Sequence, residues 1–258
     1  MTDPKPATSQ TATANHAVVD VLPFGDRTDF ESSERGLVAR AESLDIRNPD
    51  GGPVWNGDQW AFLDGDAPDS VNPSLWRQSQ LAAVHGLFEV VPDRIYQVRG
   101  YDLSVMSVVV GDTGYIVIDP LIAAETAAAA LDLVRENLGD KPVHAVIYTH
   151  SHIDHYGGVR GVVDADDVTA GKVQILAPHG FMEHAISENV MAGNAMGRRA
   201  SYMYGNLLPK DATGAVGGGL GQTTAAGTSG IIAPTDTIDE TGETRTIDGV
   251  EISVQDTP

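Results

Sequence analysis

Four side chains of the kind that bind divalent metal ions lie close together in the sequence, at His150, His152, Asp154 and His155. First-row divalent ions accept imidazole nitrogens and carboxylate oxygens, and zinc takes them in hydrolytic sites that keep one position open for water. Alternate residues of an extended segment project to the same side, so His150 and His152 could bind one ion. Asp154 and His155 follow where a turn could direct them at a second ion. The spacing predicts a binuclear hydrolytic site, and the alternative is a surface loop that happens to be rich in histidine.

The neighbouring segments must hold this cluster at the end of a strand. Residues 143–148 form an apolar run that predicts a buried strand ending just before the cluster. The preceding residues 121–138 are rich in Ala and Leu and are followed by Gly139, which predicts a helix and its end. Gly157 and Gly158, directly after the cluster, would let the backbone pass close to the metal ions because glycine has no Cβ.

Further elements are predicted on both sides of this unit. β-Branched runs around a glycine turn predict consecutive antiparallel strands before it, at residues 95–98, 103–110 and 115–118. After it we expect a strand at residues 173–178, a mostly helical segment at residues 181–204 and a long glycine-rich loop at residues 214–230. A hairpin around Asp248 and Gly249 is expected at residues 247–254. The glycine-rich loop lacks the Lys-Ser/Thr ending of a phosphate-binding loop. Together these segments indicate an α/β fold, with the cluster at the edge of a sheet covered by helices.

The first third of the chain has a different character. Residues 1–85 contain turn signals at residues 50–53, at residues 64–70 and at Asn72-Pro73, and are expected to form an extension with few regular elements. They hold all three tryptophans, Trp55, Trp60 and Trp76, and side chains of this size rarely stay in water without a partner surface. We therefore divide the chain into an N-terminal extension, residues 1–85, that packs on a main domain formed by residues 86–258.

Composition excludes several classes of function. The chain has 258 residues, and its 16 Lys and Arg against 36 Asp and Glu give a formal net charge of −20, which argues against nucleic acid as a partner. With no cysteine, disulfides, thiolate zinc sites and cysteine nucleophiles are all excluded. No signal-peptide pattern is visible, and no apolar stretch reaches the roughly 18 to 20 residues that span a bilayer, so we expect a cytoplasmic protein.

Longer stretches of the sequence resemble a known protein family. THSHIDHYGG at residues 149–158 resembles the HxHxDH signature of the metallo-β-lactamase fold, an αββα sandwich that serves lactamases, lactonases, phosphodiesterases and sulfatases. Two longer blocks, residues 179–209 and 214–238, resemble the type III alkylsulfatases, zinc enzymes that hydrolyse dodecyl sulfate and related alkyl sulfate esters to alcohol and sulfate.

This resemblance implies a binuclear zinc site and a mechanism. His150 and His152 would bind one zinc ion, and Asp154 and His155 the other. The two ions would hold a water as hydroxide, which Asp154 would also orient, making Asp154 both a ligand and a catalytic residue. The family takes further ligands, two glutamates and a histidine, from sequence that would follow Pro258. We therefore expect a partial catalytic domain that is truncated at its C-terminal side, inactive on its own, and part of a longer homodimeric enzyme.

Two other functions stay open: another hydrolase of this fold acting on a lactone, thioester or phosphodiester, and a catalytically silent fragment. Several further side chains have two interpretations each. We expect His179 and His184 to be packed or solvated, while Arg198 and Arg199 suit either a sulfate group or salt bridges. Two tyrosines and Asn194 could line a substrate pocket, and a group of apolar side chains could form a tunnel for an alkyl chain. We expect ordinary core packing for the tyrosines and for the apolar group instead. These residues are Tyr202, Tyr204, Phe181, Met182, Met191, Met196 and Met203.

Overall fold

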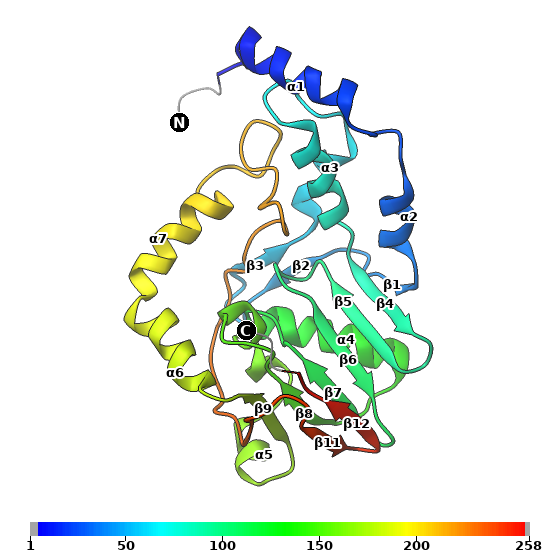
Figure 1. The fold of residues 1–258 in the computed structure, drawn as a ribbon, viewed down its shortest axis with the longest axis vertical. Coiled ribbons are helices and arrows are strands. Elements are labelled where there is room, and N and C mark those ends of the chain that lie inside the picture. The colour runs from blue at the N-terminus through cyan, green and yellow to red at the C-terminus, as the bar shows by residue number, and fades with distance from the viewer. Residues whose placement is uncertain (1–4, 256–258) are drawn as a thin grey trace.

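The centre of the molecule is an eight-stranded mixed sheet, and a computed structural model describes it together with the rest of residues 5–255. The strand order is β1-β4-β5-β6-β7-β8-β9-β10 (Figure 1). Pairing is antiparallel from β1 to β7 and parallel from β7 to β10. The strands are β1 Leu37–Ala39, β4 Gly86–Val91, β5 Ile95–Arg99, β6 Met106–Val110, β7 Tyr115–Ile118, β8 Val143–Ile147, β9 Gln174–Pro178 and β10 Asp236–Ile238. The predicted antiparallel strands within residues 95–118 are confirmed, whereas β4 and β10 were not predicted.

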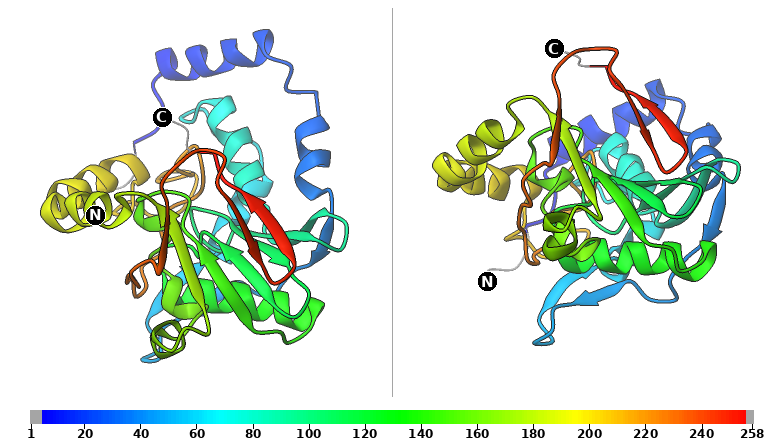
Figure 2. Two further views of the ribbon diagram at one scale, coloured as in Figure 1. Left: turned by 60° about the horizontal axis from the view of Figure 1, so that its bottom comes forward. Right: turned by 90° about the horizontal axis from the view of Figure 1, so that it is seen from below.

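Different elements cover the two faces of this sheet. Helix α4, Ala124–Leu138, buries its apolar stripe on one face, and Gly139 with φ of 102° ends it as predicted. A two-stranded hairpin, β11 Thr244–Ile247 and β12 Val250–Ser253, packs on the other face against Ile116, Ala145 and Leu176. Figure 2 shows α4 and the hairpin on opposite sides of the sheet. Residues 5–255 thus supply a helical layer, the main sheet and a hairpin on its second face.

A carboxylate ties this hairpin to the main sheet. Asp248, at φ of 45°, and Gly249, at φ of 77°, form the turn, and the predicted hairpin around them is confirmed. The Asp248 carboxylate accepts hydrogen bonds from the Thr113 and Gly114 amides at 2.9 and 2.7 Å and from Thr113 Oγ1 at 2.7 Å. The turn between β6 and β7 is therefore joined to a segment more than a hundred residues later.

The N-terminal third contains more regular structure than predicted, and that prediction was wrong. Its elements are α1 Ser9–Val21, α2 Thr28–Glu34, β2 Asp45–Arg47, β3 Pro53–Asn56, the 3-10 helix η1 Asp58–Asp64, and α3 Pro73–Ala82, besides β1. One of the signals that favoured turns, Asn72 with Pro73, is instead a helix cap, in which the Asn72 side chain accepts from the Ser74 amide with Pro73 in the first turn of α3. The Thr8 side chain caps α1 by accepting from the Thr11 amide.

All three tryptophans are buried, at 3 to 4% exposure, but in two separate clusters. Trp55 belongs to the main core and donates from Nε1 to the Gly100 carbonyl at 3.0 Å. Trp60 and Trp76 pack with Leu63 and Val216 in a second cluster. The division of the chain at residue 85 remains a prediction, and strand β1 pairs with β4 across that position.

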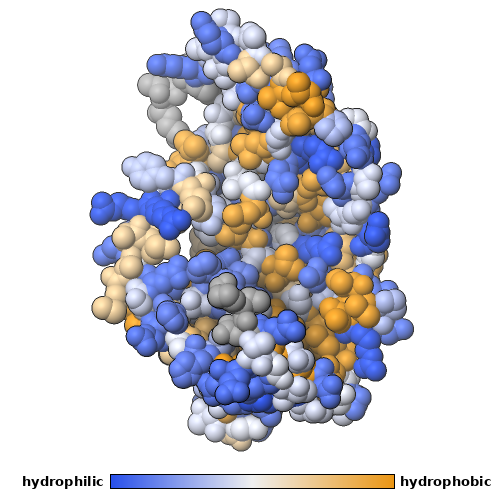
Figure 3. All heavy atoms as spheres, viewed as in Figure 1, coloured by the Kyte–Doolittle hydropathy of each residue, from blue (hydrophilic) through white to orange (hydrophobic). Residues whose placement is uncertain are grey.

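The surface mixes hydrophilic and apolar residues. On the face of Figure 3, apolar residues form separate patches among hydrophilic ones. Within residues 5–255, no helix combines the length and the apolar character that crossing a membrane requires.

Candidate metal centre and adjoining cavity

The four predicted ligands come together at the carboxyl end of β8, as the spacing suggested. His150 and His152 lie in the segment after the strand, and Asp154 and His155 in the 3-10 helix η2, Ile153–His155. The His150 ring centroid lies 4.7 Å from that of His152 and 4.1 Å from that of His155. His155 Nε2 lies 3.4 Å from Asp154 Oδ2. Nevertheless, among the described residues no three His, Asp or Glu side chains converge closely enough to hold one ion. The assignment of these four as ligands remains a prediction.

Asp119 orients two of these histidines and was missed in the sequence. It follows β7, is 8% exposed, and accepts a hydrogen bond on Oδ2 from His155 Nδ1 at 2.8 Å. Thr149 Oγ1 also donates to Oδ2, at 2.7 Å, so that hydroxyl must accept from His150 Nδ1 at 2.9 Å. In the neutral form of each imidazole, this arrangement keeps the proton on Nδ1 and leaves Nε2 as the nitrogen that could bind a ligand. Such a carboxylate behind a histidine is a regular feature of metal sites.

The loop after Asp119 approaches the cluster so closely that only glycine fits there. Asp119 and Leu121 have φ of 55° and 61°, the left-handed region that costs a leucine about 1 kcal/mol or more. The Gly158 amide donates to the Leu121 carbonyl at 2.9 Å. A Cβ on Gly158 would lie 2.2 Å from the Pro120 oxygen, and one on Gly157 would lie 2.4 Å from the Ile122 oxygen. The glycines therefore make room for these backbone carbonyls, and their predicted closeness to metal ions stays a prediction.

Carboxylates set the charge of the cluster. Burial disfavours the charged form of His155, but hydrogen bonds to Asp119 and Asp154 outweigh it and raise its pKa to about 9. Burial alone would raise the pKa of Asp154, but its contact with His155 lowers that pKa by more, so the pKa of Asp154 is below its ordinary value. The pKa of His150 is lowered by burial and by the neighbouring histidines. Positive charge is thus favoured between the carboxylates, where the fold would place a cation.

A cavity of about 650 Å³ opens onto His152, Asp154 and His155. Its opposite wall is the helical arm, which we define as residues 181–204 and which lies at the left in Figure 1. The arm comprises α6 Phe181–Ile186, a π-helical turn Ser187–Met191 and α7 Gly193–Tyr204, so the predicted helix is interrupted. The π-helical turn carries Glu188, whose Oε1 lies 3.8 Å from His152 Nε2. Such turns often mark functional positions, but sequence gave no signal for this one.

The arm distributes its side chains differently from the prediction. Phe181 is buried and Met182 packs against the core, as expected. Met196, Met203 and Tyr204 line the cavity instead of a core. Met191 and Tyr202 are 82% and 91% exposed, so the expectation of core packing was wrong for both.

The polar candidates of this region also separate. Arg199 lines the cavity and Arg198 does not, and neither forms an ion pair within the described part of the chain. Asn194 is exposed and is not a lining residue. His179 and His184 are exposed, as expected, and His179 Nδ1 lies 2.8 Å from Asp239 Oδ1.

A second buried carboxylate holds the remaining walls of the cavity. Asp102 is 3% exposed and accepts hydrogen bonds from the amides of Leu103, Ile122 and Ala225 at 2.7, 3.2 and 3.0 Å, and from Thr126 Oγ1 at 3.1 Å. Leu103 and Ile122 line the cavity, as does Thr224 next to Ala225. Burial raises the pKa of Asp102 to about 6 against these hydrogen bonds. One carboxylate thus positions three separate segments of the wall.

Comparison with known proteins identifies the family. The profile of the metallo-beta-lactamase superfamily matches residues 100–242, more than half of the chain, so the protein belongs to this superfamily, as the sequence predicted. Membership implies metal ions at the site.

Several curated relatives of this chain are alkylsulfatases. The chain is 59% identical to a linear primary-alkylsulfatase from Pseudomonas sp over 95% of its length and 37% of the relative's. It is 49% identical to the alkyl/aryl-sulfatase BDS1 of Saccharomyces cerevisiae over 96% of its length and 38% of the relative's. The solved structure of the stereoselective inverting sec-alkylsulfatase Pisa1 from Pseudomonas sp superposes with a TM-score of 0.94 at 50% identity, covering 98% of this chain and 40% of that one. The chain thus spans about two fifths of the length of these relatives.

Proposed function

We propose that the protein hydrolyses alkyl sulfate esters to an alcohol and sulfate. The observation that carries this proposal is the composition of the cavity. It is bounded by His152, Asp154 and His155 on one side and by Met196, Met203 and Arg199 on the other. An alkyl sulfate needs apolar contact for its chain, a cation for its anionic head and a hydrolytic centre beside the ester. The similarity to named alkylsulfatases supports the same substrate class.

Zinc is the metal that we propose for this site. The donor set of imidazole nitrogen and carboxylate oxygen suits zinc, and the described donors lie in close pairs. We assign His150 and His152 to one ion and Asp154 and His155 to a second. When bound, the ions would supply a water activated for attack near neutral pH and would offset charge on the ester.

The protein's own side chains have separable tasks in this proposal. Asp119 and Thr149 hold the histidine rings with Nε2 directed away from the hydrogen-bonded side. Asp154 accepts a hydrogen bond from the attacking water and so orients it. Arg199 attracts the sulfate group, while the methionines contact the alkyl chain and exclude water from it.

The direct test measures sulfate release from dodecyl sulfate by the complete gene product, with zinc content determined on the same samples. We expect His152→Ala to lose more than about a hundredfold in rate together with bound zinc. His184→Ala, an exposed histidine on the arm, is the matched control and should retain both. Sulfate release that survives His152→Ala would refute the metal assignment. Faster hydrolysis of a lactone, thioester or phosphodiester than of the sulfate ester would show that the proposed substrate class is wrong.

Residues 1–258 by themselves should show little or no turnover, because the described residues do not bring three donors around one ion. Robust hydrolysis by that purified polypeptide would contradict this expectation. Cytoplasmic location and a homodimeric enzyme are further predictions of the resemblance. They are tested by cell fractionation and by light scattering.

A further inference from the structure

One of the three clustered histidines lacks an orienting hydrogen bond. Thr149 Oγ1 lies 2.9 Å from His150 Nδ1, and Asp119 Oδ2 accepts from His155 Nδ1 at 2.8 Å. The His152 side chain is 61% exposed and forms no hydrogen bond in the part of the chain that the structure describes. A metal-binding imidazole normally donates its second ring N–H to a carboxylate, a carbonyl or a water, which fixes the direction of the ring. His152 therefore needs a partner that the strand end does not supply.

Glu188 is the one carboxylate within 4 Å of the His152 ring nitrogens among the described residues. Its Oε1 lies 3.8 Å from His152 Nε2, which is longer than a hydrogen bond but within the range of an ion pair. The Glu188 side chain is 26% exposed and has no other hydrogen bond or ion pair within residues 5–255. Because it has several rotatable bonds, a shift of about 1 Å brings the carboxylate to hydrogen-bonding distance of Nε2.

The base of the helical arm holds Glu188 next to the cluster. Asn189, the following residue, donates from Nδ2 to the Tyr156 hydroxyl at 3.1 Å. Tyr156 directly follows His155, is 4% exposed, and packs edge-on against Phe181 with ring centroids 5.4 Å apart. The first turns of the arm and the loop of the predicted ligands therefore share one buried contact.

The π-helical turn Ser187–Met191 presents its polar side chains to the cavity. Glu188 and Asn189 line the cavity, whereas Val190 and Met191 are 72% and 82% exposed. Turns of this kind are rare and often lie at functional sites. The irregularity of the helix thus places a carboxylate beside a predicted metal ligand.

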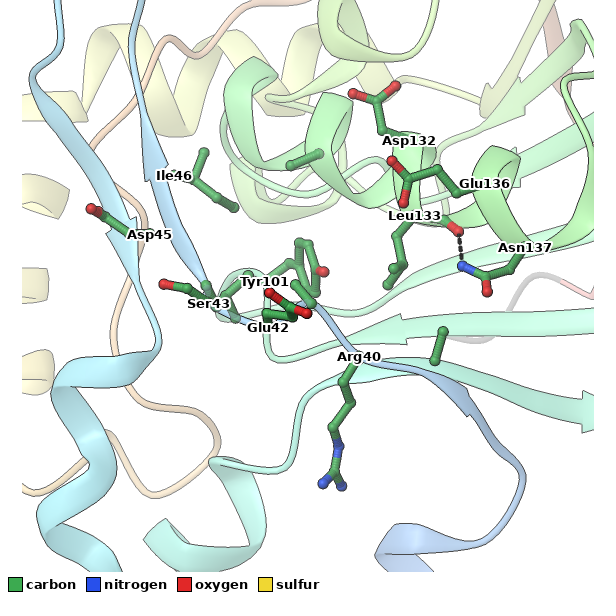
Figure 4. Close-up of a pocket in the computed structure, with 14 residues that line it drawn as sticks. Arg40, Glu42, Ser43, Asp45, Ile46, Tyr101, Asp132, Leu133, Glu136 and Asn137 are labelled. Carbon is green, nitrogen blue, oxygen red and sulfur yellow. Dashed lines mark hydrogen bonds between the residues drawn. The ribbon is translucent and has the colours of Figure 1, made fainter.

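Acids elsewhere on the surface lack this arrangement. A separate cavity of about 520 Å³ beside α4 is lined by several acids, among them Glu42, Asp132 and Glu136 (Figure 4). It shares no lining residue with the cavity at the metal centre, and no histidine lines it. Its carboxylates are therefore suitable controls for the general negative charge of the protein.

We propose that Glu188 is a positioning residue for His152, which it orients by accepting a hydrogen bond from Nε2–H. In a neutral imidazole the other nitrogen, Nδ1, then carries the lone pair that binds the metal ion. This inference rests on the proposed metal site. Thr149, Asp119 and Glu188 would each orient one histidine ring, and Glu188 alone does so from the arm. The wall of the cavity and the metal centre are coupled through this contact.

The zinc affinity of the complete gene product, measured by competition with a chelator, tests this role. We expect Glu188→Ala to bind zinc about tenfold more weakly, the lower end of the effect of losing an orienting carboxylate. Glu188→Gln keeps an acceptor oxygen and should lose only about threefold, because a neutral acceptor holds about half as strongly. Two variants at exposed carboxylates, Glu183→Ala on the arm and Glu136→Ala at the separate cavity, should match the wild type.

Cobalt in place of zinc gives a second readout that does not depend on turnover. The visible absorption of bound cobalt reports the arrangement of its ligands. Glu188→Ala should therefore shift the absorption bands, while Glu188→Gln should stay close to the wild type. The melting temperature of the metal-free protein should be the same for all three, because Glu188 has no hydrogen bond to lose within the described residues.

Several results would overturn the proposal. Wild-type zinc affinity in Glu188→Ala would show that His152 needs no partner on the arm. Equal losses in Glu188→Gln and Glu188→Ala would make Glu188 a direct ligand or a source of charge, instead of a hydrogen-bond acceptor. An equal loss in Glu136→Ala would reduce the effect to net charge.

His152→Ala separates this inference from the proposed function. If that variant loses zinc and Glu188→Ala does not, only the role of Glu188 is wrong. If His152→Ala retains zinc, the metal assignment itself is wrong, whatever Glu188→Ala does.

Discussion

His155 and Arg199 face the same cavity, but the segments that carry them are held in very different ways. His155 lies in a loop that packs against backbone carbonyls through Gly157 and Gly158 and is oriented by the buried Asp119. Arg199 lies on α7, which has no buried residue. The segment that carries the donors is thus closely packed, whereas the helix that forms the facing wall buries none of its residues. A metal centre needs fixed geometry, while an alkyl-binding wall can vary in shape without disturbing it.

The largest expected effect comes from adding one methyl group to each of these regions. Gly158→Ala should destabilise the protein by at least about 3 kcal/mol, because its Cβ would meet two backbone carbonyls. Gly197→Ala, on α7 with nothing within 4 Å of the new Cβ, should stabilise it by about 0.5 to 1 kcal/mol. Urea unfolding measures both. Equal effects would show that the two regions are packed alike.

Asp102 provides a test through pH. Its pKa is raised from 3.8 to about 6 in the folded protein, so between these values the native state holds the proton that the unfolded chain releases. Its contribution to stability is full below pH 4 and is lost as pH rises to 6, by up to about 3 kcal/mol. Asp102→Asn cannot titrate, so the difference in unfolding free energy between wild type and variant should change over this window. A constant difference would contradict the raised pKa.

The third prediction concerns the orientation of the histidines. Asp119→Asn replaces an acceptor of three hydrogen bonds and should lower zinc affinity by about 10- to 100-fold. Asp239→Asn changes the same kind of His–Asp contact at the exposed His179 and serves as the matched control. Zinc retention against a chelator measures both. If Asp239→Asn loses as much zinc, ring orientation at the cluster is not the cause.

The smallest effect is expected on the facing wall. Arg199→Ala should raise KM for dodecyl sulfate by about three- to fivefold, as expected for loss of an exposed charge contact, with little change in kcat. Arg198→Ala, its exposed neighbour outside the cavity, should change neither value. Steady-state kinetics separates them, and a loss of kcat in Arg199→Ala would place that arginine in the chemistry instead.

The sequence predicted what depends on local spacing. The clustering of His150 to His155 follows from a short segment at a strand end, and the hairpin at Asp248 follows from its turn residues. Asp119 was missed because its role depends on the parallel pairing of β7 with β8, which brings together residues about thirty positions apart. Asn72 with Pro73 was interpreted as a turn, since an N-cap and a turn share the same residue types.

The orientation of the arm could not be predicted for a different reason. A π-helical turn inserts one residue per turn, which rotates the following side chains by about 100° relative to a continuous helix. Met191, the last residue of this turn, is exposed to solvent, while Met203 on the following helix lines the cavity. Which side chains of a helix face solvent depends on the rotation of the helix about its axis. An inserted residue changes that rotation for all residues that follow it.

The hydrogen bonds of Asp248 have a consequence for the order of folding. They join residues 135 positions apart, so one apolar face of the sheet stays uncovered until the chain has been synthesised beyond the hairpin. The α4 face, by contrast, is covered by a helix that directly follows β7. Closing so long a loop costs conformational entropy, and this cost comes before the hairpin contacts can form and stabilise the fold. During translation, the nascent sheet therefore exposes Ile116, Ala145 and Leu176, and this is the interval in which a chaperone has most to cover.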